Sequence, residues 1–194
     1  MNLLFFSKII SRSFDFYTWF PVGLLVAIFR TGLSYSQIKT LSLVLLVLEV
    51  ILPISLFFLV LKKKKISDID VTKRKERYGL FGFMTVILAV SCIVAYFLGN
   101  HLFFVLQLAA LALGLTIFLI TFRFKISGHM LMNVSSIYVI NYLFGWKLLW
   151  LFLIIPLVAF ARIYLKKHTL AQVLLGLILG IAEPYLILKF FRLI

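Results

Sequence analysis

The feature that most restricts the fold of this chain is a series of apolar stretches, each close to the length of a membrane-crossing helix, separated by short polar clusters. Roughly 20 mainly apolar residues are needed for a helix to cross a bilayer. Hydrophobic residues make up 64% of the 194 positions and charged residues only 13%, about half the charged share of a soluble domain. The sequence therefore predicts an all-α integral membrane protein that forms a single domain.

Polar clusters divide the chain into seven apolar segments, which predict a bundle of six or seven transmembrane helices. We expect six of them to span: 41–61, 79–98, 101–121, 129–144, 147–160 and 169–191. The fourth and fifth are short, and an extension of each into its flanking loops stays open. The earlier segment, 16–29, contains Pro21, and two alternatives stay open for it: a tilted span or a helix in the membrane interface. The first 15 residues lack a small-residue cleavage site, so we expect no cleaved signal peptide.

Two short connections, Gly99-Asn100-His101 and Gly145-Trp146, predict helical hairpins. Because a hairpin returns the chain to the side that it left, the loops at 62–78, 122–128 and 161–168 are expected on one membrane face. Fifteen of the 20 basic residues then lie on that face. The positive-inside rule places this face in the cytoplasm. A phosphate-binding site on this face would also be basic, so the excess of basic residues has two interpretations. The five remaining basic residues are Arg30, Lys39, Lys147, Lys189 and Arg192.

The tripeptide Ser127-Gly128-His129 begins a predicted helix on the basic face, shortly after Lys125. Serine and glycine let an anion approach the backbone N–H groups of a helix start, where the helix dipole favours negative charge. A histidine beside a bound phosphate can act as a general acid. The alternative interpretation is a capped helix start followed by a histidine at the membrane interface. The tripeptide by itself favours this alternative.

A second polar cluster, at the entry to the last segment, contains Arg162, His168 and Gln172. Residues four apart share a helix face, so we expect the side-chain oxygen of Gln172 to accept a hydrogen bond from one ring nitrogen of His168. The other nitrogen is then left as a nucleophile. Further along the same stripe, Gly176 and Gly180 predict close packing against a neighbouring helix.

In three of its loops the chain resembles the type 2 phosphatidic acid phosphatase superfamily, whose lipid phosphatases are related to vanadium haloperoxidases. The second motif of that family, Pro-Ser-Gly-His, is similar to 126–129, where isoleucine replaces the proline. The third motif is Ser-Arg, five residues, His, three residues, Asp. Here its spacing is kept from Arg162 to His168 and Gln172, with Ala161 in place of the serine. The glutamine form looks like the dolichyl diphosphatase branch.

The first motif of the family, Lys, six residues, Arg-Pro, is the poorest match. Arg77 fits the arginine, but Tyr78 replaces the proline and position 70 is an aspartate. We expect Lys73 or Arg74 to supply the missing cation.

The resemblance implies an active site at one membrane face and a phosphohistidine mechanism that needs no metal and no cofactor. It implies that His168 is the nucleophile, that His129 protonates the leaving group and that Gln172 orients His168. The residues expected to bind phosphate are Arg77, Arg162, Lys125, Ser127, Gly128, Lys73 and Arg74. The expected partners are the bilayer and a membrane lipid substrate, and no nucleic acid. A polyprenyl diphosphate comes first among the substrates, ahead of phosphatidate or phosphatidylglycerol phosphate.

The three histidines are also too far apart in sequence for a zinc spacing.

The alternative from another class is an inactive family member that binds lipid phosphate or transports a solute. The departures from the motifs favour it. Glu49 and Glu183 lie within apolar segments, where an acid can mark an ion path. The simpler interpretation pairs them with Lys189, Gln107 or Asn141.

Overall fold

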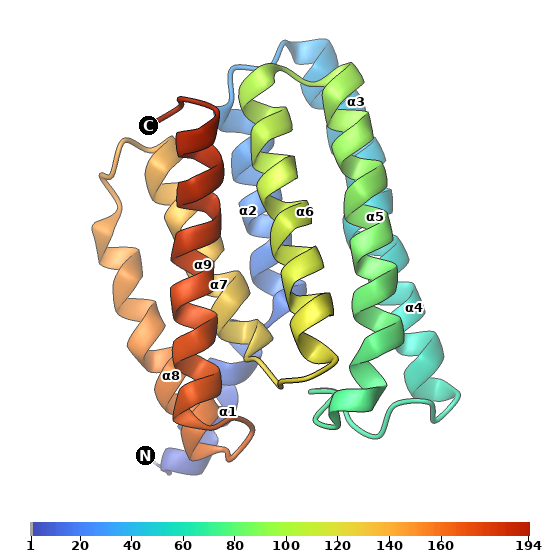
Figure 1. Cartoon of the computed structure of the whole chain (residues 1–194), viewed down its shortest axis with the longest axis vertical. Coiled ribbons are helices and arrows are strands. Elements are labelled where there is room, and N and C mark those ends of the chain that lie inside the picture. The colour runs from blue at the N-terminus through green and yellow to red at the C-terminus, as the bar shows by residue number, and fades with distance from the viewer. Residues whose placement is uncertain (1) are drawn as a thin grey trace. The chain divides into compact units, whose positions relative to one another are not determined.

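The computed structural model describes residues 2–194, and these are all-helical, with no strand among them (Figure 1). For Phe16, Tyr17 and Thr18 only the backbone is described. The elements are α1 (Leu3–Ser13), α2 (Phe16–Arg30), α3 (Tyr35–Leu45), the π-helical η1 (Leu46–Ile51), α4 (Leu52–Lys62), the 3₁₀ turn η2 (Arg74–Glu76), α5 (Arg77–Leu98), α6 (His101–Thr121), α7 (Gly128–Leu143), the 3₁₀ segment η3 (Leu149–Leu153), α8 (Ile154–Tyr164) and α9 (Leu170–Phe190).

Among the described residues, four helices are long and apolar enough to cross a membrane, which is consistent with an integral membrane protein. They are Tyr35–Lys62, Arg74–Leu98, His101–Thr121 and Leu170–Phe190. The first of them joins α3, η1 and α4 into 28 continuous residues. Trp19–Arg30 and Leu149–Tyr164 are apolar but shorter, so a total of six or seven spans stays a prediction.

The fifth predicted span, 147–160, differs from the structure at both ends. Its first part forms the 3₁₀ segment η3, and α8 begins only at Ile154, with Pro156 in its first turn, where a missing N–H is tolerated. At the other end α8 continues to Tyr164. Arg162 therefore lies in the last turn of a helix rather than in a loop, so its backbone is fixed by helical hydrogen bonds.

The chain divides into two compact units. Unit 1 contains residues 2–27 and Ile126–Arg192, and unit 2 contains Ile28–Lys125. Unit 1 holds α1, most of α2, and α7 to α9, whereas unit 2 holds α3 to α6. Each unit is described by itself below.

In unit 2, α5 and α6 form the predicted hairpin, with a turn at Gly99-Asn100 (Figure 1). The Asn100 side chain caps α6 by accepting from the backbone N–H of Phe103 (2.9 Å), and its amide donates to the carbonyl of Thr31 (2.6 Å). At the opposite end of the hairpin the rings of Tyr78 and Phe122 lie 4.9 Å apart. The loops that precede α5 and follow α6 therefore lie at the same end of unit 2, as predicted.

In unit 1, α7 and α9 pack closely and run in the same direction (Figure 1). A Cβ atom at Gly176 would lie 2.9 Å from Cβ of Met130, and one at Gly180 would lie 2.9 Å from Cβ of Val134. The predicted close packing is confirmed. Because both helices advance together from these contacts, their N-terminal ends lie at the same end of unit 1.

Candidate active site

The two N-terminal ends of α7 and α9 are joined directly. The backbone N–H of Ser127, the N-cap of α7, donates to the carbonyl of Gln172 in the first turn of α9 (3.2 Å). The Ser127 hydroxyl accepts from the backbone N–H of Met130 (3.4 Å) and is fully buried. Two positive dipole ends side by side favour an anion at this end of unit 1, and both histidines of the second and third motifs are here.

His168 lies in the turn between α8 and α9 and is only 6% exposed. Its backbone N–H donates to the carbonyl of Arg162 (3.3 Å), which folds the turn back onto the end of α8. In the side chain, Nδ1 lies 3.0 Å from Oε1 of Gln172. The predicted contact between His168 and Gln172 is therefore present.

The reason for that contact differs from the prediction, because His168 is not part of the helix. Thr169 is the N-cap of α9 and Gln172 is its N3 residue, and together they form a capping box. The side-chain oxygen of Gln172 accepts from the backbone N–H of Thr169 (3.3 Å) as well as facing Nδ1 of His168. An amide oxygen only accepts, so Nδ1 carries a proton, and in the neutral ring the lone pair lies on Nε2.

Arg162 is 1% exposed and is the largest of the fully buried side chains in unit 1. Its Nη1 donates to the hydroxyl of Ser11 in α1 (2.6 Å) and lies 3.4 Å from Nε2 of His129. A phosphate oxygen held by this guanidinium group would lie beside the His129 ring. Arg162 and His129 are thus brought together, 33 positions apart in the sequence.

His129 also faces a carboxylate, that of Asp15 in the connection between α1 and α2. Its Nε2 lies 3.2 Å from Oδ1 of Asp15. The backbone carbonyl of His129 accepts from the amide of Asn133 (2.7 Å), and the same amide donates to the carbonyl of Phe14 (2.8 Å). These bonds tie the start of α7 to the segment that carries Asp15.

The two contacts of Nε2 belong to different protonation states of His129. An arginine only donates, so the Arg162 contact is a hydrogen bond only when Nε2 has a lone pair. The Asp15 contact is a hydrogen bond only when Nε2 carries a proton. The ring can therefore lose or gain a proton at Nε2 and keep a hydrogen-bond partner in both states. A histidine that acts first as a general acid and then as a general base needs such an arrangement.

Sequence reasoning missed Asp15 and Ser11, because no function was assigned to the first 15 residues. A usable signal is present in α1, where Ser7 and Ser11 are four residues apart, share one face and are both buried. This face packs against α8. Ser11 thereby supplies a hydroxyl to Arg162, although Ala161 replaces the motif serine beside that arginine.

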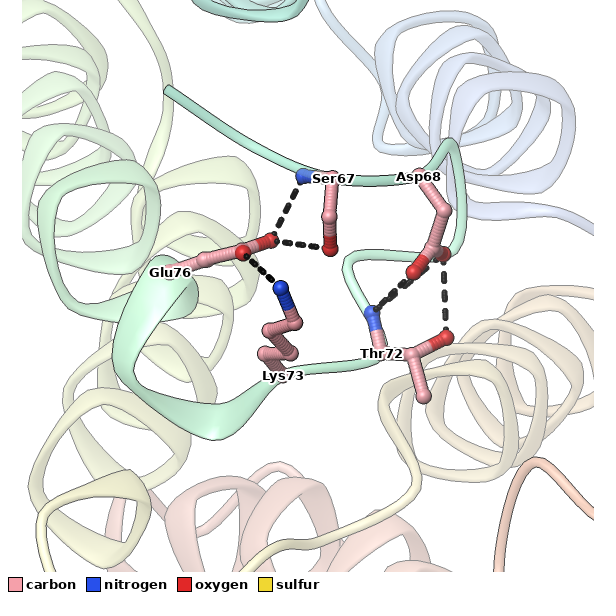
Figure 2. Close-up of polar contacts among 5 residues, drawn as sticks. All are labelled: Ser67, Asp68, Thr72, Lys73 and Glu76. Carbon is pink, nitrogen blue, oxygen red and sulfur yellow. Dashed lines mark hydrogen bonds and ion pairs between the residues drawn. The ribbon is translucent and has the colours of Figure 1, made fainter. Parts of the chain in front are cut away.

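The residues predicted from the first motif lie in unit 2: Lys73 and Arg74 are in the connection between α4 and α5, and Arg77 is the first residue of α5. Figure 2 shows the contacts of Lys73 in this connection. Glu76 accepts from the backbone N–H and the hydroxyl of Ser67 (2.8 and 3.0 Å) and pairs with Lys73 (3.5 Å). Asp68 accepts from the backbone N–H and the hydroxyl of Thr72 (3.3 and 2.9 Å). This carboxylate thus orders its own loop, and Lys73, with a side chain 70% exposed, is engaged by Glu76.

Arg77 is buried at the start of α5, where its Nε donates to the carbonyl of Val71 (2.7 Å). Val71 is itself buried and has a φ of +46°. Arg74 and Lys125 are half-buried and belong to the same unit. The predicted phosphate ligands are therefore divided between the units, with Arg162, Ser127 and Gly128 in unit 1 and the other cations in unit 2.

Within residues 2–194, no group of three or more His, Cys, Asp or Glu side chains is placed to hold a metal ion. No family model, curated protein or solved structure matches the chain. The resemblance of its three loops to a phosphatase superfamily therefore stays a prediction from the sequence.

Proposed function

We propose that the chain is a membrane lipid phosphatase that resembles the type 2 phosphatidic acid phosphatases. The observation that carries this proposal is the arrangement of His168, Arg162 and His129 at the paired helix starts of unit 1. A histidine with a defined tautomer, a buried guanidinium group and a second histidine with a carboxylate partner are a nucleophile, a phosphate ligand and a proton donor. This combination favours phosphoryl transfer.

In the proposed first step, Nε2 of His168 attacks phosphorus, so that an N–P bond forms as the P–O bond to the leaving group breaks. His129 gives its proton to the departing oxygen, which belongs to the lipid alcohol of a monoester or to the lipid monophosphate of a diphosphate. Water then attacks the phosphohistidine, His129 takes a proton from it, and inorganic phosphate and free His168 are released.

Cations and backbone N–H groups are proposed to hold the phosphate oxygens as negative charge builds up. In unit 1 these are the Arg162 guanidinium group and the N–H groups at Gly128, next to the capping residue Ser127. The sequence predicts further phosphate ligands in unit 2, namely Arg77, Lys125 and one cation of the pair Lys73 and Arg74. Of that pair, the contact between Lys73 and Glu76 favours Arg74.

The substrate class follows from the membrane setting. The helices present large exposed apolar surfaces, so a water-soluble substrate has no dedicated domain to capture it. We propose a polyprenyl diphosphate as the substrate, with phosphatidate or phosphatidylglycerol phosphate second. The proposal also includes six or seven membrane spans, with the basic loops on the cytoplasmic face.

The test is the release of inorganic phosphate by the purified protein in detergent, with a chelator present, from polyprenyl diphosphate and from phosphatidate. We expect metal-independent release from polyprenyl diphosphate that is lost in His168→Ala. His101→Ala is the matched control, because His101 is an exposed histidine at the start of α6, and this variant should keep full activity. Release that survives in His168→Ala would contradict the mechanism, and a preference for phosphatidate would overturn the substrate choice.

A second candidate is a catalytically inactive protein that binds lipid phosphate. Two observations favour it: the partner of His168 is a neutral amide, and alanine occupies the position of the motif serine. Such a protein would bind vanadate or lipid phosphate without turnover. No phosphate release by folded protein that still binds vanadate would therefore establish the second candidate.

A further inference from the structure

Unit 2 contains a cluster of polar side chains that the proposed phosphatase mechanism does not use. Glu49, Ser91 and Gln107 come from three of the four long apolar helices and are 2%, 0% and 4% exposed. Ser91 and Gln107 are the polar side chains that face the Glu49 carboxyl group. The rest of each helix around them is predominantly apolar.

Glu49 lies far from water along its helix. It is near the middle of the 28-residue segment Tyr35–Lys62, so about 20 Å of helix extends on either side of it at 1.5 Å per residue. Neither carboxyl oxygen of Glu49 has a hydrogen-bond partner, and the same is true of Oγ of Ser91 and Nε2 of Gln107. Lys189, one of the partners predicted for an intramembrane acid, lies in unit 1 and donates to the hydroxyl of Tyr185 (3.4 Å).

An isolated carboxylate in an apolar interior is unfavourable by several kcal/mol, so buried acids are paired, protonated or bound to a cation. No arginine, lysine or histidine in the described chain pairs with Glu49. The titratable group that faces it is the thiol of Cys92, which is next to Ser91 on α5. Since a thiol does not supply a positive charge, neutralisation has to come from a small cation.

The backbone around Glu49 is also unusual, because residues Leu46–Ile51 form a π-helical turn. Short π-helical turns occur within α-helices often at functional sites, since the extra residue changes the direction of a side chain without ending the helix. Here the turn carries the buried acid. Ser42, seven residues earlier on the same helix, adds a further buried hydroxyl without a partner.

We propose that Glu49, Ser91 and Gln107 form a buried binding site for a monovalent cation, a proton or a sodium ion, among the apolar helices of unit 2. The carboxylate of Glu49 supplies the negative charge, the hydroxyl of Ser91 supplies a neutral oxygen, and Nε2 of Gln107 can donate a hydrogen bond to the carboxylate. A bound proton makes Glu49 a neutral carboxylic acid. A sodium ion is instead coordinated by these oxygens.

Infrared spectroscopy of the purified protein in lipid nanodiscs tests this site, because a protonated carboxyl group has its own carbonyl-stretch band. The chain has only 6 acidic side chains, so loss of a band in Glu49→Gln assigns that band to Glu49. Spectra are recorded in choline chloride and in sodium chloride, for the parent protein, Glu49→Gln and the matched control Glu183→Gln.

If the cation is a proton, the parent protein shows the band in both salts, Glu183→Gln keeps it and Glu49→Gln loses it. If it is sodium, the band appears in choline and disappears in sodium, again only when Glu49 is present. A band that is absent in both salts, or that Glu49→Gln keeps, overturns the proposal. Should Glu49→Gln fail to fold, Ser91→Ala serves instead, since loss of the hydroxyl is expected to shift the band of the neighbouring carboxyl group. If Ser91→Ala leaves the band unshifted, the proposed site is overturned.

Discussion

Nε2 of His129 lies 3.2 Å from Oδ1 of Asp15, so a carboxylate between α1 and α2 contacts the imidazole that we propose as the general acid. This pair joins two segments that are more than 100 positions apart in the sequence. The contact fixes the orientation of the ring relative to Arg162, and it gives the protonated ring an acceptor.

Loss of this carboxylate is expected to slow the reaction. A hydrogen bond to a charged group contributes about 1.5–3 kcal/mol, so Asp15→Ala should lower the rate of phosphate release about ten- to hundredfold. Asp15→Asn keeps an acceptor oxygen and should fall in between. Initial rates at saturating lipid measure the effect, with Asp70→Ala as a control from unit 2. A parental rate in Asp15→Ala would remove Asp15 from the mechanism.

The tautomer of His168 depends on the Gln172 side chain, and two substitutions separate its functions. Gln172→Ala removes a hydrogen bond of about 1 kcal/mol, so turnover should fall several-fold, up to about tenfold. Gln172→Glu keeps an acceptor at the capping position and adds negative charge that stabilises a cationic ring, so turnover should match or exceed that of the parent. Single-turnover formation of the phosphohistidine is the measurement, and equal rates in the two variants would count against the orienting role.

The geometry of Arg162 predicts a strong difference between arginine and lysine. A guanidinium group can donate to a phosphate and to Ser11 at the same time, whereas an ammonium group acts as a point charge. Arg162→Lys should therefore lower kcat at least tenfold. Arg123→Lys, at an exposed arginine after α6, is the control and should leave kcat unchanged. Unchanged turnover in Arg162→Lys would contradict the assignment.

The contact between α7 and α9 predicts a stability difference between two glycine substitutions. In Gly176→Ala the new methyl group would lie 2.9 Å from the carbonyl oxygen of Ser127, and overpacking of this kind is unfavourable by about 1–3 kcal/mol. Gly79→Ala, on α5, meets nothing within 4 Å and gains about 0.5–1 kcal/mol of helix propensity. Thermal unfolding in detergent should give a lower Tm for the first variant only. Equal Tm values would mean that α7 and α9 are not this close.

The loop between α4 and α5 is held by the carboxylate of Glu76 (Figure 2). Glu76→Ala removes the acceptor of the Ser67 backbone N–H, so hydrogen exchange at Ser67 should become faster. Lys75→Ala changes an exposed neighbour in the same short helix and should leave that exchange rate alone. If Ser67 exchanges equally fast in both variants, Glu76 does not order the loop.

The sequence was sufficient for the cores of the long apolar helices and for contacts that depend on local spacing. Apolar runs mark α5, α6 and α9 closely, and the small residues Gly176 and Gly180 predict the contact with α7. The 3₁₀ start of the fifth segment was not predicted, because a continuous apolar run contains no signal for where a 3₁₀ segment gives way to an α-helix.

Contacts between distant segments could not be predicted in this way. The hydrogen bond from Arg162 to Ser11 spans 151 positions. The spacing of Ser7 and Ser11 marks a polar face of α1, but it does not say that α8 is the helix that covers this face. Gln107 was expected beside an intramembrane acid and faces Glu49. The absence of a basic partner for Glu49 could not be predicted, because pairing depends on which groups the other helices bring to it.

The bond between Ser11 and Arg162 has a consequence for biosynthesis. Translation produces α1 long before α8, so the nascent chain carries the hydroxyl of Ser11 without its guanidinium partner while the intervening helices enter the membrane. His168 and Gln172 are translated later still. The candidate centre of unit 1 can therefore close only after these late segments have been inserted, and a ribosome that stalls before α9 leaves a membrane protein with no assembled centre.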